Sequence, residues 1–297
     1  MKIGIIGAGA LGTFLGGILG KYNDVLIVGK HDKDIGEIEI SGKTNIKVNI
    51  DYTTDHSRLK NSELIIICTK SYDTREAIRE INSYINDSAL VLSLQNGLDN
   101  EKIISNYIEG KKVIGGITGL GVTYLEDGKV KHAGKGETII GKYKAKNDRY
   151  IFDIKEVLEK SGLEVSVSDN IYGHIWKKVI INSSINPLTA LTGLKNGALL
   201  EHDYLHELLK DVCLESTKVA KKEVDLPSDN MVEETEKVAK MTSGNISSML
   251  QDIENKNKTE IECINGAVVS KGKKFGISTP YNETLFSLIK GKEDEYL

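Results

Sequence analysis

The feature that most constrains this sequence is a glycine pattern close to its N-terminus. Residues 7–12 read GAGALG, which is the pattern G-x-G-x-x-G, and they directly follow an isoleucine-rich run at residues 2–6. Because 29 of the 297 residues are glycine, the pattern alone is weakly specific. A strand before it and a helix after it make it typical of the phosphate-binding turn of a Rossmann domain. We therefore expect this turn to bind the phosphates of a dinucleotide.

Each glycine of the turn has its own expected role. Gly7 permits the tight turn, Gly9 lets the backbone approach a pyrophosphate, and Gly12 lets helix and strand pack closely. The start of the helix offers free N–H groups and a positive dipole to the phosphates. A plain glycine-rich turn between a strand and a helix is the alternative. The residues expected to bind the cofactor here are Gly7, Ala8, Gly9, Ala10, Leu11 and Gly12.

Short apolar runs alternate with helix-length segments through the rest of the first half. This alternation predicts parallel strands with helices on both faces, a doubly wound α/β domain. A hairpin is predicted around Glu126-Asp127-Gly128. A helix at about 150–161 and a strand at 163–167 are expected to end this half. The runs expected to form the earlier strands lie at residues 2–6, 25–28, 64–68, 89–94 and 112–117.

From about residue 171 onward the hydrophobic period is that of helices. The stretches 201–224, 231–240 and 246–276 are charged and amphipathic, and they predict helices. We place the domain boundary near Asp169-Asn170, where either residue can cap a helix. The prediction is an α/β protein with an N-terminal Rossmann dinucleotide-binding domain (1–169) and a C-terminal all-helical domain (170–297). The charged tail at 292–295 is expected to be solvated.

Charge and composition argue against several classes of protein. With 39 Lys and Arg against 43 Asp and Glu, and no long basic run, neither nucleic acid nor an anionic membrane is an expected partner. The apolar runs are too short to cross a bilayer. Three scattered cysteines without zinc-ligand spacing indicate a reduced, cytoplasmic protein without a metal site. We expect a small-molecule substrate, and the amphipathic second half is compatible with a homodimer.

The end of the second expected strand bears on the type of cofactor. A domain that prefers NAD usually has Asp or Glu at this point. The sequence here reads Val28-Gly29-Lys30-His31-Asp32. Lys30 can meet a 2′-phosphate, which favours NADPH. The alternative is that Lys30 is a solvated surface lysine and that Asp32 binds the ribose.

A polar stripe interrupts the apolar stretch 171–185. Lys178, Asn182 and Asn186 are spaced four residues apart, so they drift by only about 40° per step around a helix. The lysine can supply a proton and a positive charge, and the asparagines can orient a substrate. A solvated surface stripe is the alternative. Pro187 is expected to end or kink the helix.

Several segments together resemble the ketopantoate reductase (2-dehydropantoate 2-reductase) family. They are residues 2–12, Thr69-Lys70, Gln95-Asn96-Gly97, 176–190 (WKKVIINSSINPLTA) and 245–266 (NISSMLQDIENKNKTEIECING), of which the last two are long and specific. The resemblance implies a Rossmann domain joined to a helical domain (170–297) that binds substrate and carries the catalytic residues. It also implies NADPH-dependent reduction of 2-dehydropantoate to (R)-pantoate, with hydride transfer to the C2 ketone, on the way to pantothenate and coenzyme A.

The resemblance also implies roles for individual residues of the second half. Lys178 matches the catalytic lysine, which donates the proton, and Glu260 matches the glutamate near it. Asn182 and Asn186 match the substrate-binding asparagines, and Ser248 matches the serine that holds the substrate.

In the first half, Lys70 and Asn96 match positions at the cofactor and the active-site cleft, so Lys70 is expected to bind the cofactor and Asn96 to contact both ligands. Lys30 falls where many members have arginine. The charge is retained there, but the bidentate geometry of a guanidinium is lost.

The residues leave other functions open. A reductase of another 2-oxo acid in the same family would differ only in pocket residues outside these segments. An opine or hydroxyacid dehydrogenase would share the two-domain plan and use NAD. A dinucleotide-binding sensor would need no proton donor, so the set Lys178, Asn182, Asn186, Ser248 and Glu260 argues against it.

Overall fold

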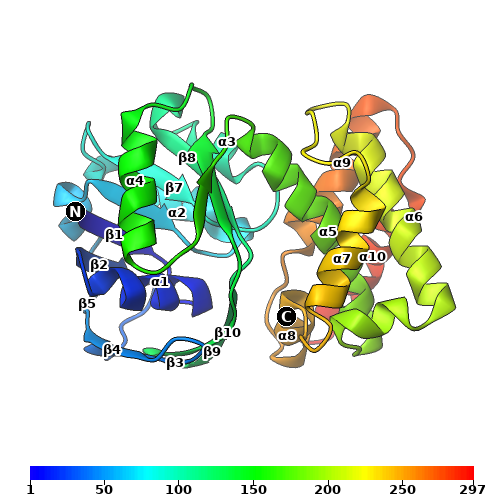
Figure 1. Ribbon diagram of the computed structural model, residues 1–297, viewed down its shortest axis with the longest axis horizontal. Helices are drawn as coiled ribbons and strands as arrows, with labels where there is room; N and C mark the ends of the chain where they lie inside the picture. The colour runs from blue at the N-terminus through cyan, green and yellow to red at the C-terminus, as the bar shows by residue number, and fades with distance from the viewer. The chain divides into compact units, whose positions relative to one another are not determined.

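The computed structural model describes residues 1–297, and the chain forms two compact units (Figure 1). The first unit comprises Met1–Gln95 and Asp99–Ile171, and the second comprises Asn96–Leu98 and Tyr172–Leu297. The short segment Asn96–Leu98 therefore belongs by its contacts to the second unit. The domain boundary near Asp169-Asn170 stays a prediction from the sequence.

The first unit is built on an eight-stranded sheet with the order β12-β11-β8-β7-β6-β1-β2-β5. Its pairs are parallel except for β8 with β11. Because β1 lies between β6 and β2, the strand order reverses direction at β1, which is where such sheets bind ligands. The strands are β1 (Lys2–Ile6), β2 (Asp24–Val28), β5 (Asp51–Thr53), β6 (Leu64–Ile67), β7 (Leu90–Ser93), β8 (Val113–Thr118), β11 (Thr138–Lys142) and β12 (Val165–Val167).

Alternate side chains of the central strands fill two separate cores, one on each face of this sheet. In β6, Leu64 and Ile66 pack with residues of α1 (Ala10–Gly20) and α4 (Arg149–Lys160). Ile65 and Ile67 pack instead with α2 (Thr74–Ile81) and α3 (Asn100–Ile104). All four β6 side chains are fully buried, which explains the uninterrupted apolar run. Each such side chain contributes about 1.5–3 kcal/mol to stability.

A second, four-stranded sheet covers the other side of α1. It has the order β4 (Ile46–Asn49), β3 (Glu37–Gly42), β10 (Lys129–Gly134), β9 (Gly121–Glu126). The predicted hairpin is formed by β9 and β10, with Gly128 at φ +74°. A Cβ on Gly17 would lie 2.7 Å from Ile40 Cδ1, so glycine lets α1 approach β3 closely. Strands β3, β4, β5 and β11 were not expected from the sequence.

The second unit is helical. The stretch 246–276, expected to be helical, is not one continuous helix: the chain leaves α8 after Glu254, adopts a left-handed conformation at Lys256 (φ +54°), forms a short 3-10 helix at Ile261–Cys263 and enters the next α-helix at Asn265. No helix in the structure is both long and apolar enough to cross a membrane. The helices are α5 (Ile171–Thr192), α6 (Asp203–Ala220), α7 (Met231–Met241), α8 (Ser248–Glu254), α9 (Asn265–Phe275) and α10 (Pro280–Glu293).

Pro187 does not end α5, which continues to Thr192. A proline cannot donate the backbone hydrogen bond that would normally reach the carbonyl four residues earlier, here that of Ser183. The Asn265 side chain donates to this carbonyl from Nδ2 at 3.0 Å. The polar group that Pro187 leaves unpaired in the helix is therefore satisfied from α9.

Candidate active site

The glycine turn is tightly packed at Gly7 and Gly12 and open to solvent space at Gly9. Gly7 has φ +105°, which favours glycine. A Cβ on Gly12 would lie 1.9 Å from the Gly7 carbonyl oxygen, so only glycine lets α1 start this close to β1. A Cβ on Gly9 would meet no atom within 4 Å. The backbone at Gly9 is thus accessible to a ligand, as a phosphate-binding turn requires.

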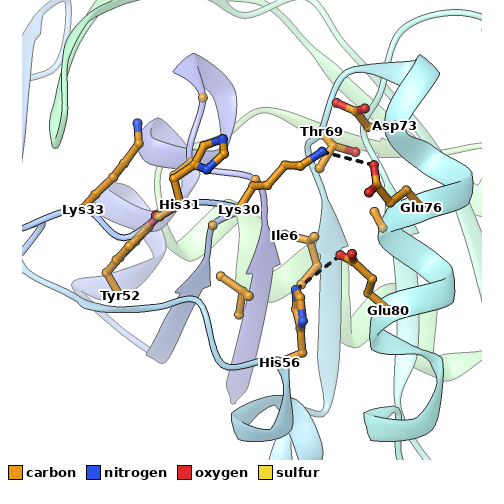
Figure 2. Close-up of a pocket in the computed structure, with 16 residues that line it drawn as sticks. Ile6, Lys30, His31, Lys33, Tyr52, His56, Thr69, Asp73, Glu76 and Glu80 are labelled. Carbon is orange, nitrogen blue, oxygen red and sulfur yellow. Dashed lines mark hydrogen bonds and ion pairs between the residues drawn. The ribbon is translucent and has the colours of Figure 1, made fainter.

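A cavity of about 260 Å³ opens beside this turn (Figure 2). It lies where β1 and β2 end, and residues that follow β6 and part of α2 complete its wall. Of the residues expected to bind the cofactor, Gly7, Ala8, Gly9 and Lys30 line it. The expected residues Ala10, Leu11, Gly12, Lys70 and Asn96 are not among its lining residues.

The conformation around Lys30 depends on its neighbours. A Cβ on Gly29 would lie 2.0 Å from the Tyr52 hydroxyl, so glycine at this position lets Tyr52 lie against the chain. The Tyr52 hydroxyl donates to the backbone carbonyl of His31. Asp32, the alternative ribose ligand, does not line the cavity, and its carboxylate accepts from Thr54 Oγ1 at 2.9 Å.

Acidic residues do line the cavity, but they come from α2 and the turn before it. Asp73, Glu76 and Glu80 face it, and sequence reasoning missed all three. Lys30 Nζ lies 3.1 Å from Glu76 Oε2, and His56 Nε2 lies 3.7 Å from Glu80 Oε2 (Figure 2). The signal in the sequence is the spacing of three and four residues, which places these acids on one face of a helix.

In the second unit, α5 carries the polar stripe Lys178, Asn182 and Asn186. Lys178 and Asn182 are half-buried and Asn186 is buried, so the stripe is not a solvated face. Burial lowers the pKa of Lys178 to about 8, and the charge of Glu260 opposes this by raising it. The neighbouring Lys177 instead forms an ion pair with Glu234.

The segment Asn96–Leu98 packs against the chain around Glu260 and so places Asn96 next to Glu260. Asn96 Nδ2 donates to Glu260 Oε2 at 2.9 Å, and Glu260 is 5% exposed. Gly97 has φ +83°, and a Cβ there would lie 2.7 Å from Cys263 Cβ. Leu98 N donates to the Cys263 carbonyl at 3.0 Å. Gly97 therefore allows the close backbone approach that sets Asn96 against Glu260.

The two serines at the start of α8 differ in their surroundings. Ser247 is buried, its hydroxyl accepts from Leu250 N at 3.1 Å, and Thr189 Oγ1 donates to it at 2.7 Å. It thus caps α8 and ties it to α5. Ser248 is the first residue of α8, and its side chain is exposed. Its role in holding a substrate stays a prediction.

Both parts of the chain match models of one protein family. Residues 3–145 match the model described as ketopantoate reductase PanE/ApbA, and residues 170–293 match its C-terminal counterpart. The chain belongs to the ketopantoate reductase family. It is an oxidoreductase with a Rossmann-type fold.

Relatives in the ketopantoate reductase family match over nearly the whole chain. The 2-dehydropantoate 2-reductase of Pyrococcus horikoshii is 38% identical, covering 99% of this chain and 98% of its own length. That of Archaeoglobus fulgidus is 35% identical and covers 98% of both chains.

Two solved structures are similar to the chain over its whole length. A ketopantoate reductase from Ralstonia eutropha has a TM-score of 0.91 at 29% identity, covering 100% of this chain and 99% of its own. A D-mandelate dehydrogenase in complex with NADH and anilino(oxo)acetate has a TM-score of 0.92 at 29% identity, with the same coverage.

Proposed function

We propose that this chain catalyses the NADPH-dependent reduction of 2-dehydropantoate to (R)-pantoate, a step toward pantothenate and coenzyme A. The observation that carries the proposal is the half-buried Lys178, whose pKa is lowered to about 8 and which experiences the charge of Glu260. A lysine with a pKa near the working pH is suited to donate a proton. The curated 2-dehydropantoate 2-reductases that match the chain over nearly its full length support the choice of substrate.

The first unit fits a nicotinamide dinucleotide. The open backbone at Gly9 suits a pyrophosphate, and Lys30 lines the adjoining cavity, which would receive the adenosine half of the cofactor. Lys30 would contact the 2′-phosphate and so favour NADPH over NADH. When bound, such a cofactor supplies a hydride for the C2 carbon of the ketone.

The residues of the second unit would supply the proton and orient the substrate. Protonated Lys178 stabilises the negative charge that develops on the ketone oxygen and donates its proton to that atom. Glu260 favours the charged form of Lys178, and Asn96 holds Glu260. Asn182, Asn186 and Ser248 would bind the carboxylate and hydroxyl groups of the substrate.

The test is the loss of reduced-nicotinamide absorbance when the purified protein meets 2-dehydropantoate with NADPH or with NADH. Faster turnover with NADPH supports the whole proposal, and turnover only with NADH overturns the choice of cofactor. The likeness to D-mandelate dehydrogenase favours a second candidate, an oxidoreductase of another 2-hydroxy acid. Oxidation of D-mandelate with NAD⁺, without turnover of 2-dehydropantoate, would favour that candidate.

A further inference from the structure

In the cavity beside the glycine turn, Lys30 forms an ion pair with Glu76. Lys30 Nζ reaches across to Glu76 Oε2 on α2, at 3.1 Å (Figure 2). The pKa of Lys30 is raised, mainly by its hydrogen bond with Glu76 and by the charge of Glu76, with smaller contributions from Asp73 and Glu80. The cation expected to meet a 2′-phosphate is thus already in contact with a carboxylate.

The other charged residues that line the cavity do not offset the negative charge of Glu76 beside Lys30. Lys33 is held by Asp127 and by the Tyr124 hydroxyl. Of the acids, Glu80 lies 3.7 Å from His56 Nε2, while Glu76 contacts Lys30 directly. Lining acids outnumber lining lysines, three to two. A dianionic group that enters near Lys30 therefore meets carboxylates in the cavity wall, and one of them, Glu76, is already paired with that lysine.

NADPH and NADH differ in how they respond to this arrangement. A phosphate monoester carries about −1.5 to −2 charges at neutral pH, so it competes with Glu76 for Lys30 and is repelled by that carboxylate. A ribose without the phosphate presents neutral hydroxyl groups, which can donate hydrogen bonds to a carboxylate. Glu76 can therefore perform, from α2, the task that an acid at the end of β2 performs in NAD-preferring domains.

We propose that Glu76 is a specificity-determining residue that reduces the preference for NADPH over NADH, by competing with the 2′-phosphate for Lys30 and by accepting hydrogen bonds from the unphosphorylated ribose. This rests on the proposed function only in that the chain binds a nicotinamide dinucleotide. The side chains of Lys30 and Glu76 are 65% and 43% exposed, so solvent screens the interaction. The effect is a few-fold change in affinity rather than many orders of magnitude.

The test measures the dissociation constants of NADPH and NADH by calorimetric titration of the wild-type protein and the Glu76→Gln variant. We expect the substitution to tighten NADPH binding about two- to tenfold and to leave NADH binding unchanged or weaker. Glu80→Gln is the matched control, because it removes an equal charge one turn further along the same helix, and it should change the affinity ratio less. Equal changes for both nucleotides, or an unchanged ratio, would overturn the proposal.

A double-mutant cycle with Lys30→Gln separates a direct effect from a general change in charge. If Glu76 acts through Lys30, the gain in NADPH affinity on Glu76→Gln should shrink when Lys30 is absent. An equal gain in both backgrounds contradicts the competition. If the wild-type protein binds neither nucleotide, the proposed function fails together with this inference. If it binds both and the ratio does not respond, only this inference fails.

Discussion

The Glu293 carboxylate, near the end of the chain, holds Thr259, the residue before Glu260. One carboxylate oxygen accepts from Thr259 N at 2.7 Å and from Thr259 Oγ1 at 2.6 Å, and the other accepts from Lys290 Nζ at 2.8 Å. Glu293 is fully buried, so the expectation that the whole charged tail is solvated is wrong for this residue. The contact fixes the chain where it leaves the helical path between α8 and α9.

Replacing Glu293 by alanine should destabilise the helical unit by about 3 kcal/mol, because it leaves the buried N–H and hydroxyl of Thr259 without their acceptor. Urea unfolding measures the change. Glu295→Ala is the control, because Glu295 is exposed two residues later and should change stability by less than about 0.5 kcal/mol. Equal stability of the two variants would show that the buried contact contributes little.

Lys178→Ala should lower kcat about a hundredfold or more while leaving NADPH affinity nearly unchanged, because it removes the proton donor but not the dinucleotide cavity. Lys177→Ala is the matched control, since Lys177 is the preceding residue on α5 and pairs with Glu234. Steady-state kinetics and a cofactor titration separate the two effects. Normal turnover in Lys178→Ala would remove this lysine from the mechanism.

The activity should decline at alkaline pH, since only protonated Lys178 can donate a proton and its pKa is lowered to about 8. Glu260→Gln removes the negative charge that raises this pKa, so the alkaline limb of kcat/KM should move to lower pH. Glutamine still offers Asn96 an acceptor oxygen. A limb that stays in place would mean that Glu260 does not act through the charge of Lys178.

Gly9→Ala should weaken dinucleotide binding, whereas Gly12→Ala should lower the stability of the protein itself. At Gly9 a Cβ meets no protein atom within 4 Å, so the variant should fold normally but bind the dinucleotide more weakly. At Gly12 a Cβ would lie 1.9 Å from the Gly7 carbonyl oxygen, so the variant should lose thermal stability even without ligand. Thermal unfolding with and without NADPH distinguishes the two, and equal melting temperatures of the ligand-free variants would contradict this reading.

The dinucleotide domain was predictable from the sequence because its signals are local. The glycine turn, the buried strands and the hairpin around Gly128 each depend on neighbouring residues. The four-stranded sheet was less predictable from the sequence, since β3 pairs with β10, about 90 residues away along the chain. The acids around Lys30 were also missed, because only the folded sheet brings α2 beside the end of β2.

The helical character of the second unit was predictable from the sequence, but its contacts between distant residues were not. Lys178 and the asparagines of α5 follow a visible period, whereas Glu260 lies outside any regular helix and was indicated only by the family resemblance. The continuation of α5 through Pro187 depends on the Asn265 side chain, which is far away in sequence. The burial of Glu293 likewise depends on Thr259, 34 residues earlier.

Glu101 should make the protein less stable as the pH rises. It is 2% exposed, its Oε2 has no hydrogen-bond partner, and burial raises its pKa from 4.5 to about 7. Between these two values the folded state keeps a proton that the unfolded state releases, so the free energy of unfolding falls as pH increases, by up to about 3 kcal/mol in total. The loss should be complete above pH 7 and absent below about pH 4.5.

Glu101→Gln removes this ionisation and retains the shape of the side chain. The variant should therefore be more stable than the wild-type protein at pH 8, and the advantage should disappear as the pH falls toward 5. Glu109→Gln is the control, because Glu109 is exposed and Lys111 lowers its pKa, so its loss should slightly destabilise the protein at pH 8. Urea unfolding at the two pH values checks both signs. A Glu101→Gln variant with the pH dependence of the wild-type protein would show that Glu101 ionises in the folded state as readily as in the unfolded chain.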